Sequence, residues 1–124
     1  MQIKLDKNKF YEQLKRFNNK YIPIFIMMPI GNSNYSIILD ENRIAQKIEH
    51  NYTLQIFDRT KTGYEKYLCK DIDFNLLKEN IRSDYQLYKF ISKKINEVVK
   101  WVKKVLNIVN LVNTKKNVLK IIGA

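Results

Sequence analysis

The sequence has few of the residues from which catalytic and metal sites are most often built. It holds one cysteine, Cys69, which excludes an intrachain disulfide and argues against a cysteine-based metal site. Its one histidine, His50, cannot by itself form a Ser-His-Asp triad or a multi-histidine metal site. The three glycines, Gly31, Gly63 and Gly123, stand apart, so the chain has no glycine-rich phosphate loop. We therefore expect a protein without metal or cofactor, which acts by binding and not by catalysis.

Acidic residues are also scarce, and their distribution along the chain is uneven. The chain has 23 lysines and arginines against 12 acidic residues, a net charge of +11. Residues 1–73 contain 12 basic and 9 acidic side chains, whereas residues 74–124 contain 11 and 3, with no acidic residue after Glu97. This asymmetry favours an acidic partner, such as a phosphate backbone, an anionic membrane or an acidic protein groove.

Length and composition are those of one globular domain. The chain has 124 residues, of which 45% are hydrophobic and 28% charged, and it contains no internal repeat and no linker. We expect a single domain over residues 1–124, with a helix and β-meander in residues 1–73 and a basic helical region in residues 74–124. Met1 to Asn19 mixes charges throughout, so we expect no signal peptide and a cytoplasmic protein. Heavy use of lysine, asparagine and isoleucine is typical of an A/T-rich genome, such as that of a low-GC bacterium or its phages.

The predicted fold is α+β: an N-terminal helix, an antiparallel meander of three to five strands, and a long C-terminal amphipathic helix. The apolar run after Tyr21 predicts a strand buried on both faces. Pro23 and Pro29 interrupt the uncharged stretch that contains it, which argues against a membrane span. Polar turns are expected over Asp40–Asn42 and Asp58–Gly63. The predicted elements before the long helix are a helix over Lys7–Asn19 with Asp6 as its N-cap, strands over Tyr21–Met28 and Tyr35–Leu39, a segment over Arg43–Glu49 that is either a short helix or a strand, strands over Tyr52–Phe57 and Tyr64–Cys69, and a short helix over Phe74–Arg82 with Asp73 as its N-cap.

The strongest pattern is an apolar stripe in the last third of the chain. Ser83 and Gln86 have the spacing of a capping box, which predicts a helix from Asp84 to Asn113, about 45 Å long at ~1.5 Å per residue. Such a helix is longer than a small domain is wide, so we expect it to extend beyond its own domain, to break, or to pair with a second copy. Its stripe recurs at steps of three and four, the spacing of a coiled-coil seam: Tyr88, Ile91, Ile95, Val98, Val102, Val105, Val109 and Val112. Packing against the protein's own core and self-association as a homodimer are the alternatives for this face.

The basic C-terminal third is the predicted site for a partner. We expect nucleic acid or a nucleoprotein complex, and a small regulator or inhibitor from a phage or other mobile element fits this description. The predicted binding residues are Lys93, Lys94, Lys100, Lys103, Lys104, Lys115, Lys116 and Lys120. The predicted seam for self-association or for a partner consists of Ile91, Ile95, Val98, Val102, Val105 and Val109.

Two other functions stay open at this point. The first is a metal-independent, toxin-like ribonuclease, in which cations stabilise the charge that develops at phosphorus. Its candidate residues are His50, Arg59, Lys61, Tyr64, Lys66 and Tyr67. The second is binding to a membrane surface through the C-terminal helix, because Trp101 has basic flanks.

Two further groupings bear on these alternatives. Aromatic and basic residues alternate in segments 64–70 and 85–89, a pattern that can bind single strands by stacking and phosphate neutralisation. Four carboxylates cluster around the last predicted hairpin, at Asp58, Glu65, Asp71 and Asp73. Their spacing matches no metal-binding loop, so we expect them to serve turns and helix caps.

Overall fold

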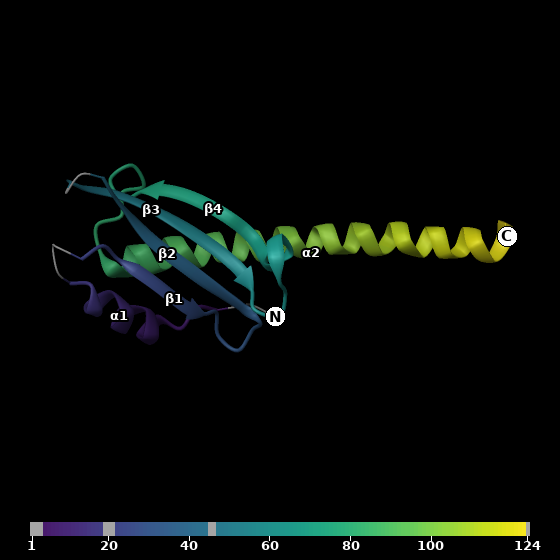
Figure 1. The fold of residues 1–124 in the computed structure, drawn as a ribbon, viewed down its shortest axis with the longest axis horizontal. Coiled ribbons are helices and arrows are strands. Elements are labelled where there is room, and N and C mark those ends of the chain that lie inside the picture. The colour runs from purple at the N-terminus through teal and green to yellow at the C-terminus, as the bar shows by residue number, and fades with distance from the viewer. Residues whose placement is uncertain (1–3, 19–21, 45–46, 124) are drawn as a thin grey trace.

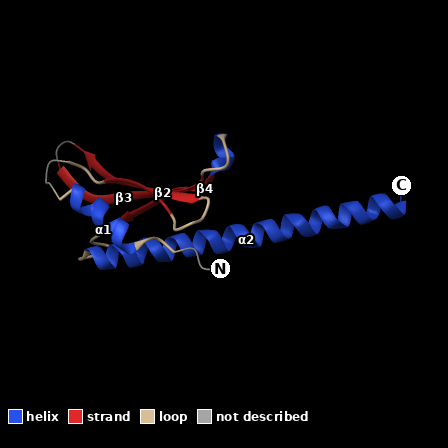
Figure 2. Ribbon diagram, turned by 90° about the horizontal axis from the view of Figure 1, so that it is seen from below, coloured by secondary structure: helices blue, strands red, loops and turns tan. Residues whose placement is uncertain are grey.

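A four-stranded antiparallel sheet is covered on one of its faces by both α-helices. The computed structural model describes residues 4–18, 22–44 and 47–123; the side chains of residues 43–44, 47–50, 70, 103 and 105–123 lie outside the description. The strands are ordered β1-β2-β3-β4, so each one pairs with its neighbour in the sequence. Figures 1 and 2 show α1 and α2 on the same side of this sheet, and the predicted α+β class is confirmed. In order, the elements are α1 (Lys7–Arg16), β1 (Phe25–Pro29), β2 (Tyr35–Ile44), β3 (Lys47–Asp58), the short 3₁₀ helix η1 (Gly63–Lys66), β4 (Tyr67–Asn75) and α2 (Asp84–Gly123).

Alternation along the strands divides the sheet into two faces. We call the face under the helices the covered face and the other one the open face. In cross-strand register, Ile26 lies beside Leu39 and Leu39 beside Leu54, and all three side chains are fully buried on the covered face. The intervening residues point to the open face, because successive side chains of a strand alternate. The core therefore lies between the covered face and the two helices.

The first half of the chain differs from prediction in two places. The strand after Tyr21 is not buried on both faces: in β1, Ile26 is buried, whereas Met27 is exposed. The reason is that helices cover only one side of the sheet. The predicted turn over Asp40–Asn42 is also wrong, because β2 continues to Ile44 and pairs with β3 throughout. The ambiguous segment Arg43–Glu49 therefore contributes to two strands.

The predicted helix over Phe74–Arg82 is wrong as well. Phe74 is buried in β4, which pairs with β3 as far as Asn75. The chain then turns, since Asn75 Oδ1 accepts hydrogen bonds from the backbone nitrogens of Leu77 (3.0 Å) and Lys78 (3.3 Å). Asp73 is consequently a strand residue and caps no helix. An asparagine that bonds the backbone two residues on favours a turn over a helix.

Helix α1 begins as predicted and ends earlier. Asp6 Oδ1 accepts a hydrogen bond from the Lys9 nitrogen at 3.0 Å, which confirms the N-cap. The helix ends at Arg16, with Phe17 as its C-cap, and not at Asn19. Its buried residue Phe10 packs against Tyr88 of α2, with ring centroids 6.0 Å apart.

Helix α2 begins with the predicted capping pair. Ser83 Oγ accepts a hydrogen bond from the Gln86 nitrogen (3.2 Å), and Gln86 Oε1 accepts one from the Arg82 nitrogen (2.6 Å). In a capping box the second bond would go to the nitrogen of Ser83 itself, so the reciprocal pair is shifted by one residue. Farther along, the hydroxyl of Tyr88 donates to the Leu5 carbonyl oxygen at 2.9 Å and holds the N-terminal segment against the helix.

The length of α2 exceeds that of the sheet that it covers. The helix has 40 residues, about 60 Å at ~1.5 Å per residue, and it continues to Gly123 where an end at Asn113 was predicted. Among the side chains of α2 that are described, Val99 is the last one that is buried. From residue 100 onward the helix leaves the sheet and projects away from the rest of the molecule (Figures 1 and 2). We call residues 100–123 the overhang.

Candidate functional site

Four lysines follow one line along α2. Lys89, Lys93, Lys100 and Lys104 stand at positions i, i+4, i+11 and i+15, so on a helix of 3.6 residues per turn they share one side. All four side chains are exposed, whereas Ile91 and Ile95 on the opposite side are fully buried. We call these four residues the lysine stripe. It is about 22 Å long at ~1.5 Å per residue, and it continues from the body of the protein onto the overhang.

Glu97, the acidic residue between Lys89 and Lys104 in the sequence, is already paired. Glu97 Oε2 lies 3.5 Å from Nζ of Lys94, and that ammonium group also lies 5.5 Å from the centroid of the Phe90 ring. Within the described part of the chain, Lys93, Lys100 and Lys104 have no such ion-pair partner. The lysine stripe therefore presents positive charge that the protein does not neutralise itself.

An aromatic ring adjoins the stripe at the start of α2. Tyr85 is 48% exposed, and the ammonium groups of Lys7 and Lys89 lie 5.3 Å and 5.0 Å from its ring centroid. Two segments distant in sequence meet here, because the N-terminal segment passes over the beginning of α2. Between them lies a cavity of about 630 Å³. It is lined by Lys4, Leu5, Asp6, Lys7, Asn8, Gly31, Asn32, Tyr85, Tyr88 and Lys89.

The position of the N-terminal segment depends on a glycine. Gly31 has φ +54°, and a Cβ atom added to it would lie 2.9 Å from the backbone oxygen of Lys4. A side chain at this position would therefore clash with backbone as well as adopt an unfavourable conformation. The close approach brings Lys4 and Lys7 to the same cavity as Tyr85.

The open face of the sheet carries a network of polar side chains. Thr53 Oγ1 accepts a hydrogen bond from Asn42 Nδ2 (3.2 Å) and donates to Asp73 Oδ1 (2.8 Å), which links β2, β3 and β4. In the next row, Gln55 Nε2 donates to Asp71 Oδ1 at 3.1 Å. Asp71 and Asp73 therefore lie on the open face as acceptors in a fixed arrangement.

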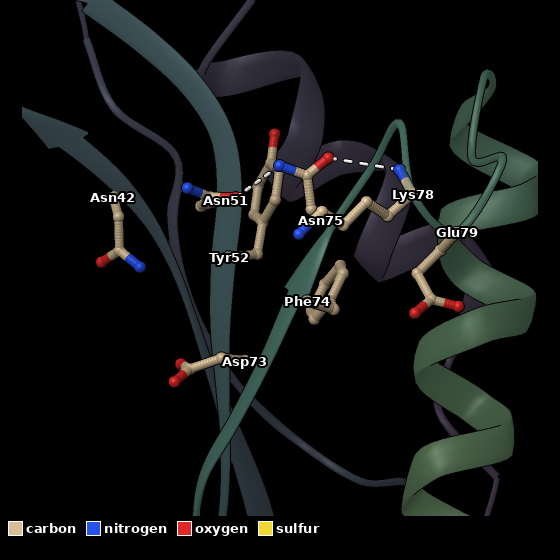
Figure 3. A pocket seen from close by; sticks show the side chains of 8 residues that line it. All are labelled: Asn42, Asn51, Tyr52, Asp73, Phe74, Asn75, Lys78 and Glu79. Carbon is tan, nitrogen blue, oxygen red and sulfur yellow. Dashed lines mark hydrogen bonds between the residues drawn. The ribbon is translucent and has the colours of Figure 1, made fainter.

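A shallow pocket lies where these rows end. Figure 3 shows its lining, in which Asn75 Nδ2 donates to Asn51 Oδ1 at 2.5 Å and Asn75 also holds the turn to Lys78. The volume is about 400 Å³. The lining residues are Asn42, Asn51, Tyr52, Asp73, Phe74, Asn75, Lys78 and Glu79. The asparagine amides and Asp73 form hydrogen bonds between strands or within the turn, so the pocket arises from the way in which the sheet ends.

The predicted binding lysines divide into three groups. Lys93, Lys100 and Lys104 lie together on the lysine stripe. Lys94 is turned aside to Glu97. The side chains of the other predicted lysines lie outside the described residues: Lys103, Lys115, Lys116 and Lys120.

The predicted seam divides in the same way. Ile91 and Ile95 are buried in the protein's own core, so core packing applies to them. Val98 and Val102 are half-buried where the helix leaves the sheet. The side chains of Val105 and Val109 lie outside the described residues.

Two of the candidate ribonuclease residues, His50 and Arg59, lie at opposite ends of one strand. His50, whose side chain is outside the description, belongs to β3, and Arg59 follows the far end of that strand. The extended chain between them spans about 30 Å at ~3.3 Å per residue. Arg59 joins two turns, since its Nη2 donates to the Ser33 oxygen at 2.5 Å and its Nε to the Asn34 oxygen at 3.4 Å.

Two titratable groups near the last hairpin have shifted pKa values. The hydroxyl of Thr60 donates to Asp58 Oδ1 at 2.6 Å, and this bond, with a second one from the Thr60 nitrogen, lowers the pKa of Asp58. Burial raises the pKa of the Cys69 thiol, and the negative charge of Asp71 raises it further. Asp58 therefore serves a turn, as expected, and Cys69 is a poorly reactive thiol at neutral pH.

Sites of two other kinds are absent from the described part of the chain. Among the side chains that are described, no three histidine, cysteine or acidic residues lie together as metal ligands. No helix in the described ranges is sufficiently long and apolar to cross a bilayer. Comparisons with protein-family models, curated proteins and solved structures found no match.

The sequence did not predict two features of the molecular surface. Lys7 joins Tyr85 and Lys89 only through the tertiary structure, which no local pattern signals. The open face was missed because the apolar run in β1 was interpreted as buried on both sides. The even spacing of Asp71 and Asp73, which places both on one face of a strand, could have indicated it.

Proposed function

We propose that this protein is a non-catalytic binding protein whose partner is nucleic acid, alone or in a nucleoprotein complex. The observation that carries the proposal is the lysine stripe: four exposed lysines in line on a rigid helix, three of them without an ion-pair partner in the described part of the chain. Binding to phosphates releases condensed counterions, which supplies affinity without sequence recognition. A small regulator or inhibitor that acts by occupying nucleic acid fits this surface.

The neighbourhood of Tyr85 supports a preference for single strands. An exposed ring can stack with a base, and lysines beside the ring can neutralise the adjacent phosphates. Lys7 and Lys89 lie within 5.3 Å of this ring centroid, and Lys89 is also the first member of the lysine stripe. A strand bound along the stripe would thus meet Tyr85 at one end.

The test is the salt dependence of binding to fluorescently labelled oligonucleotides, followed by anisotropy from about 50 to about 300 mM salt. Changing Lys93, Lys100 and Lys104 together to Gln should weaken binding similarly for all sequences. The slope of log K against log salt should become flatter by about two to three units, because each lost phosphate contact removes ~0.7 to ~0.9. The protein should stay folded, since all three side chains are exposed.

A second triple variant controls for net charge. Lys61 and Lys78 are exposed and Lys66 is half-buried; all three lie at the ends of the sheet and are not on the stripe. Their joint change to Gln alters the net charge equally and should leave most of the salt slope intact. Equal slopes for the two triple variants, or no binding by the natural sequence at low salt, would refute the proposal.

A membrane surface is the second candidate, and one observation favours it. Trp101 is 62% exposed at the start of the overhang, between Lys100 and Lys104, and tryptophan with lysine flanks is common in helices that lie on anionic membranes. This function predicts flotation with vesicles that contain phosphatidylserine but not with pure phosphatidylcholine, and loss of flotation in Trp101→Ala. Equal recovery with both kinds of vesicle excludes it.

A further inference from the structure

The open face of the sheet has an apolar half that no described element covers. Phe25 and Met27 of β1 are 47% and 55% exposed, and Met27 lies beside the half-buried Ile38 in register. Phe57 of β3 is half-buried on the same face. Both helices lie on the other side of the sheet (Figure 2). An exposed apolar patch of this kind, with polar residues around it, marks an interaction site more often than a monomer surface.

Carboxylates adjoin this patch. Asp40 pairs in register with Phe25, and Asp71 and Asp73 extend the acidic character across the sheet to β4. Among the side chains that are described on the open face of the four strands, none is a lysine or an arginine. In a chain of net charge +11, the described part of this face is an acidic exception.

The overhang has the complementary properties. It contains six lysines and no acidic residue, and Trp101 near its start is 62% exposed. The apolar stripe predicted from spacing continues along it, on the side opposite Lys100 and Lys104. Its own sheet presents the open face in the opposite direction, and the helix projects away from it (Figure 2). The overhang therefore cannot fold back onto the open face of its own chain.

Pairing of two overhangs with each other is disfavoured by charge. The lysines that flank the stripe of one overhang would face those of the other, with no carboxylate from either overhang to neutralise them. Coiled coils depend on opposite charges beside the seam to set the partner, and like charges there are destabilising. A surface with carboxylates next to apolar side chains satisfies the overhang better.

We propose that the open sheet face binds the overhang of a second copy of this chain. The overhang is about 36 Å long at ~1.5 Å per residue. The longest strand, β3, has 12 residues and spans about 40 Å at ~3.3 Å per residue, so the two dimensions agree. The helix lies with its apolar side on Phe25 and Met27 and with flanking lysines near Asp40, Asp71 and Asp73. The sheet is then covered on both faces, and the lysine stripe stays directed outward.

The interface joins two different surfaces, so it can be dissected by mixing variants. One variant, Met27→Lys, removes the patch on the sheet and keeps the overhang intact. The other, Trp101→Glu, damages the overhang and keeps the sheet intact. Both side chains are more than half exposed, so neither substitution should prevent the monomer from folding. Asp40→Lys serves as a second sheet variant, because Asp40 is exposed and its charge is reversed without loss of apolar area.

Light scattering and analytical ultracentrifugation at micromolar concentration, on nuclease-treated protein, provide the readout, with circular dichroism to verify folding. We expect the natural sequence to associate, each variant alone to be monomeric, and an equimolar mixture of Met27→Lys with Trp101→Glu to form a 1:1 dimer. Asp40→Lys should behave like Met27→Lys. A heterologous contact predicts this rescue, since the mixture still contains one intact sheet face and one intact overhang.

Three results would overturn the proposal. The first is that the natural sequence is monomeric at every concentration measured. The second is that Met27→Lys and Asp40→Lys associate as the natural sequence does, which would point to overhangs paired with each other. The third is that the mixture fails to form the dimer. Because no nucleic acid is present, these outcomes are independent of the function proposed above. An unchanged salt slope in the Lys93, Lys100 and Lys104 variant, with intact self-association, would refute that function alone.

Discussion

The two parts of α2 have similar amphipathic sequences and different surroundings. In residues 84–99, the apolar side is buried against the sheet and α1, with Ile91 and Ile95 fully enclosed. In residues 100–123, the same kind of sequence continues as a helix beyond the edge of the sheet (Figure 1). The first part contains Asp84 and Glu97, whereas the second has six lysines and no acidic residue. A single helix thus serves the core at one end and is available for a partner at the other.

This difference has an energetic meaning. Each fully buried large apolar side chain contributes roughly 1.5 to 3 kcal/mol to the stability of the folded state, and residues 84–99 supply five buried apolar residues. An isolated helix gains nothing comparable, because most helical stability in proteins comes from packing of an apolar face. Stability should therefore be concentrated in the first part of α2, whereas the second part should contribute little to it.

The largest expected effect tests whether stability is concentrated in the first part of α2. Ile91→Ala should lower the free energy of unfolding by about 2 to 5 kcal/mol, because Ile91 is fully buried and the cavity cannot collapse freely. The matched change in the second part, Trp101→Ala, should alter it by less than about 0.5 kcal/mol at concentrations where the protein is monomeric. Urea denaturation followed by circular dichroism measures both. A loss in Trp101→Ala as large as that in Ile91→Ala would show that the overhang belongs to the cooperative unit.

A smaller effect is expected for the hydrogen bond between the first part of α2 and the N-terminal segment. Tyr88→Phe removes the hydrogen bond to the Leu5 oxygen and leaves a buried carbonyl group without this donor. We expect a loss of about 1 to 3 kcal/mol, typical of an unsatisfied buried acceptor. Tyr85→Phe is the control, since the Tyr85 side chain is 48% exposed and should tolerate the change. Amide hydrogen exchange should also accelerate around Leu5 in Tyr88→Phe, and unchanged exchange there would contradict the role of this bond.

The sequence predicted the elements whose signals are local. The Asp6 cap, the Ser83 and Gln86 pair and the apolar spacing of α2 depend on residues within a few positions of each other. The structure contains the cap and, shifted by one residue, the pair, and it buries the first part of the apolar stripe. The boundaries of helices were less accurate. The predicted end at Asn113, a weak helix former, does not occur, because propensity is a weak determinant within a long helix.

The errors arose where the outcome depends on another part of the chain. Whether β1 is buried on one face or two depends on where α1 and α2 lie, and the sequence of β1 does not contain that information. Asp40 to Asn42 resemble a turn in composition, yet their cross-strand partners in β3 extend the hairpin. The same reason explains why the neighbourhood of Lys7, Tyr85 and Lys89 was not predicted, since it forms only when the N-terminal segment reaches α2.

The smallest expected effect on stability lies at the boundary between the two parts of α2. Glu97→Gln removes the ion pair with Lys94, which is exposed and has the lysine N-terminal to the glutamate, the less favourable order on a helix. The free energy of unfolding should change by less than about 0.5 kcal/mol. Binding to nucleic acid should nevertheless become tighter, because the last acidic residue beside the stripe is gone and Lys94 is released. The salt slope should become steeper by up to ~0.9, the value of one further phosphate contact.

Glu79→Gln makes the same change in net charge beside the pocket at the end of the sheet and should alter affinity less. If the two variants bind equally well, phosphates do not follow the lysine stripe past Glu97, and the functional surface must be sought elsewhere on the molecule.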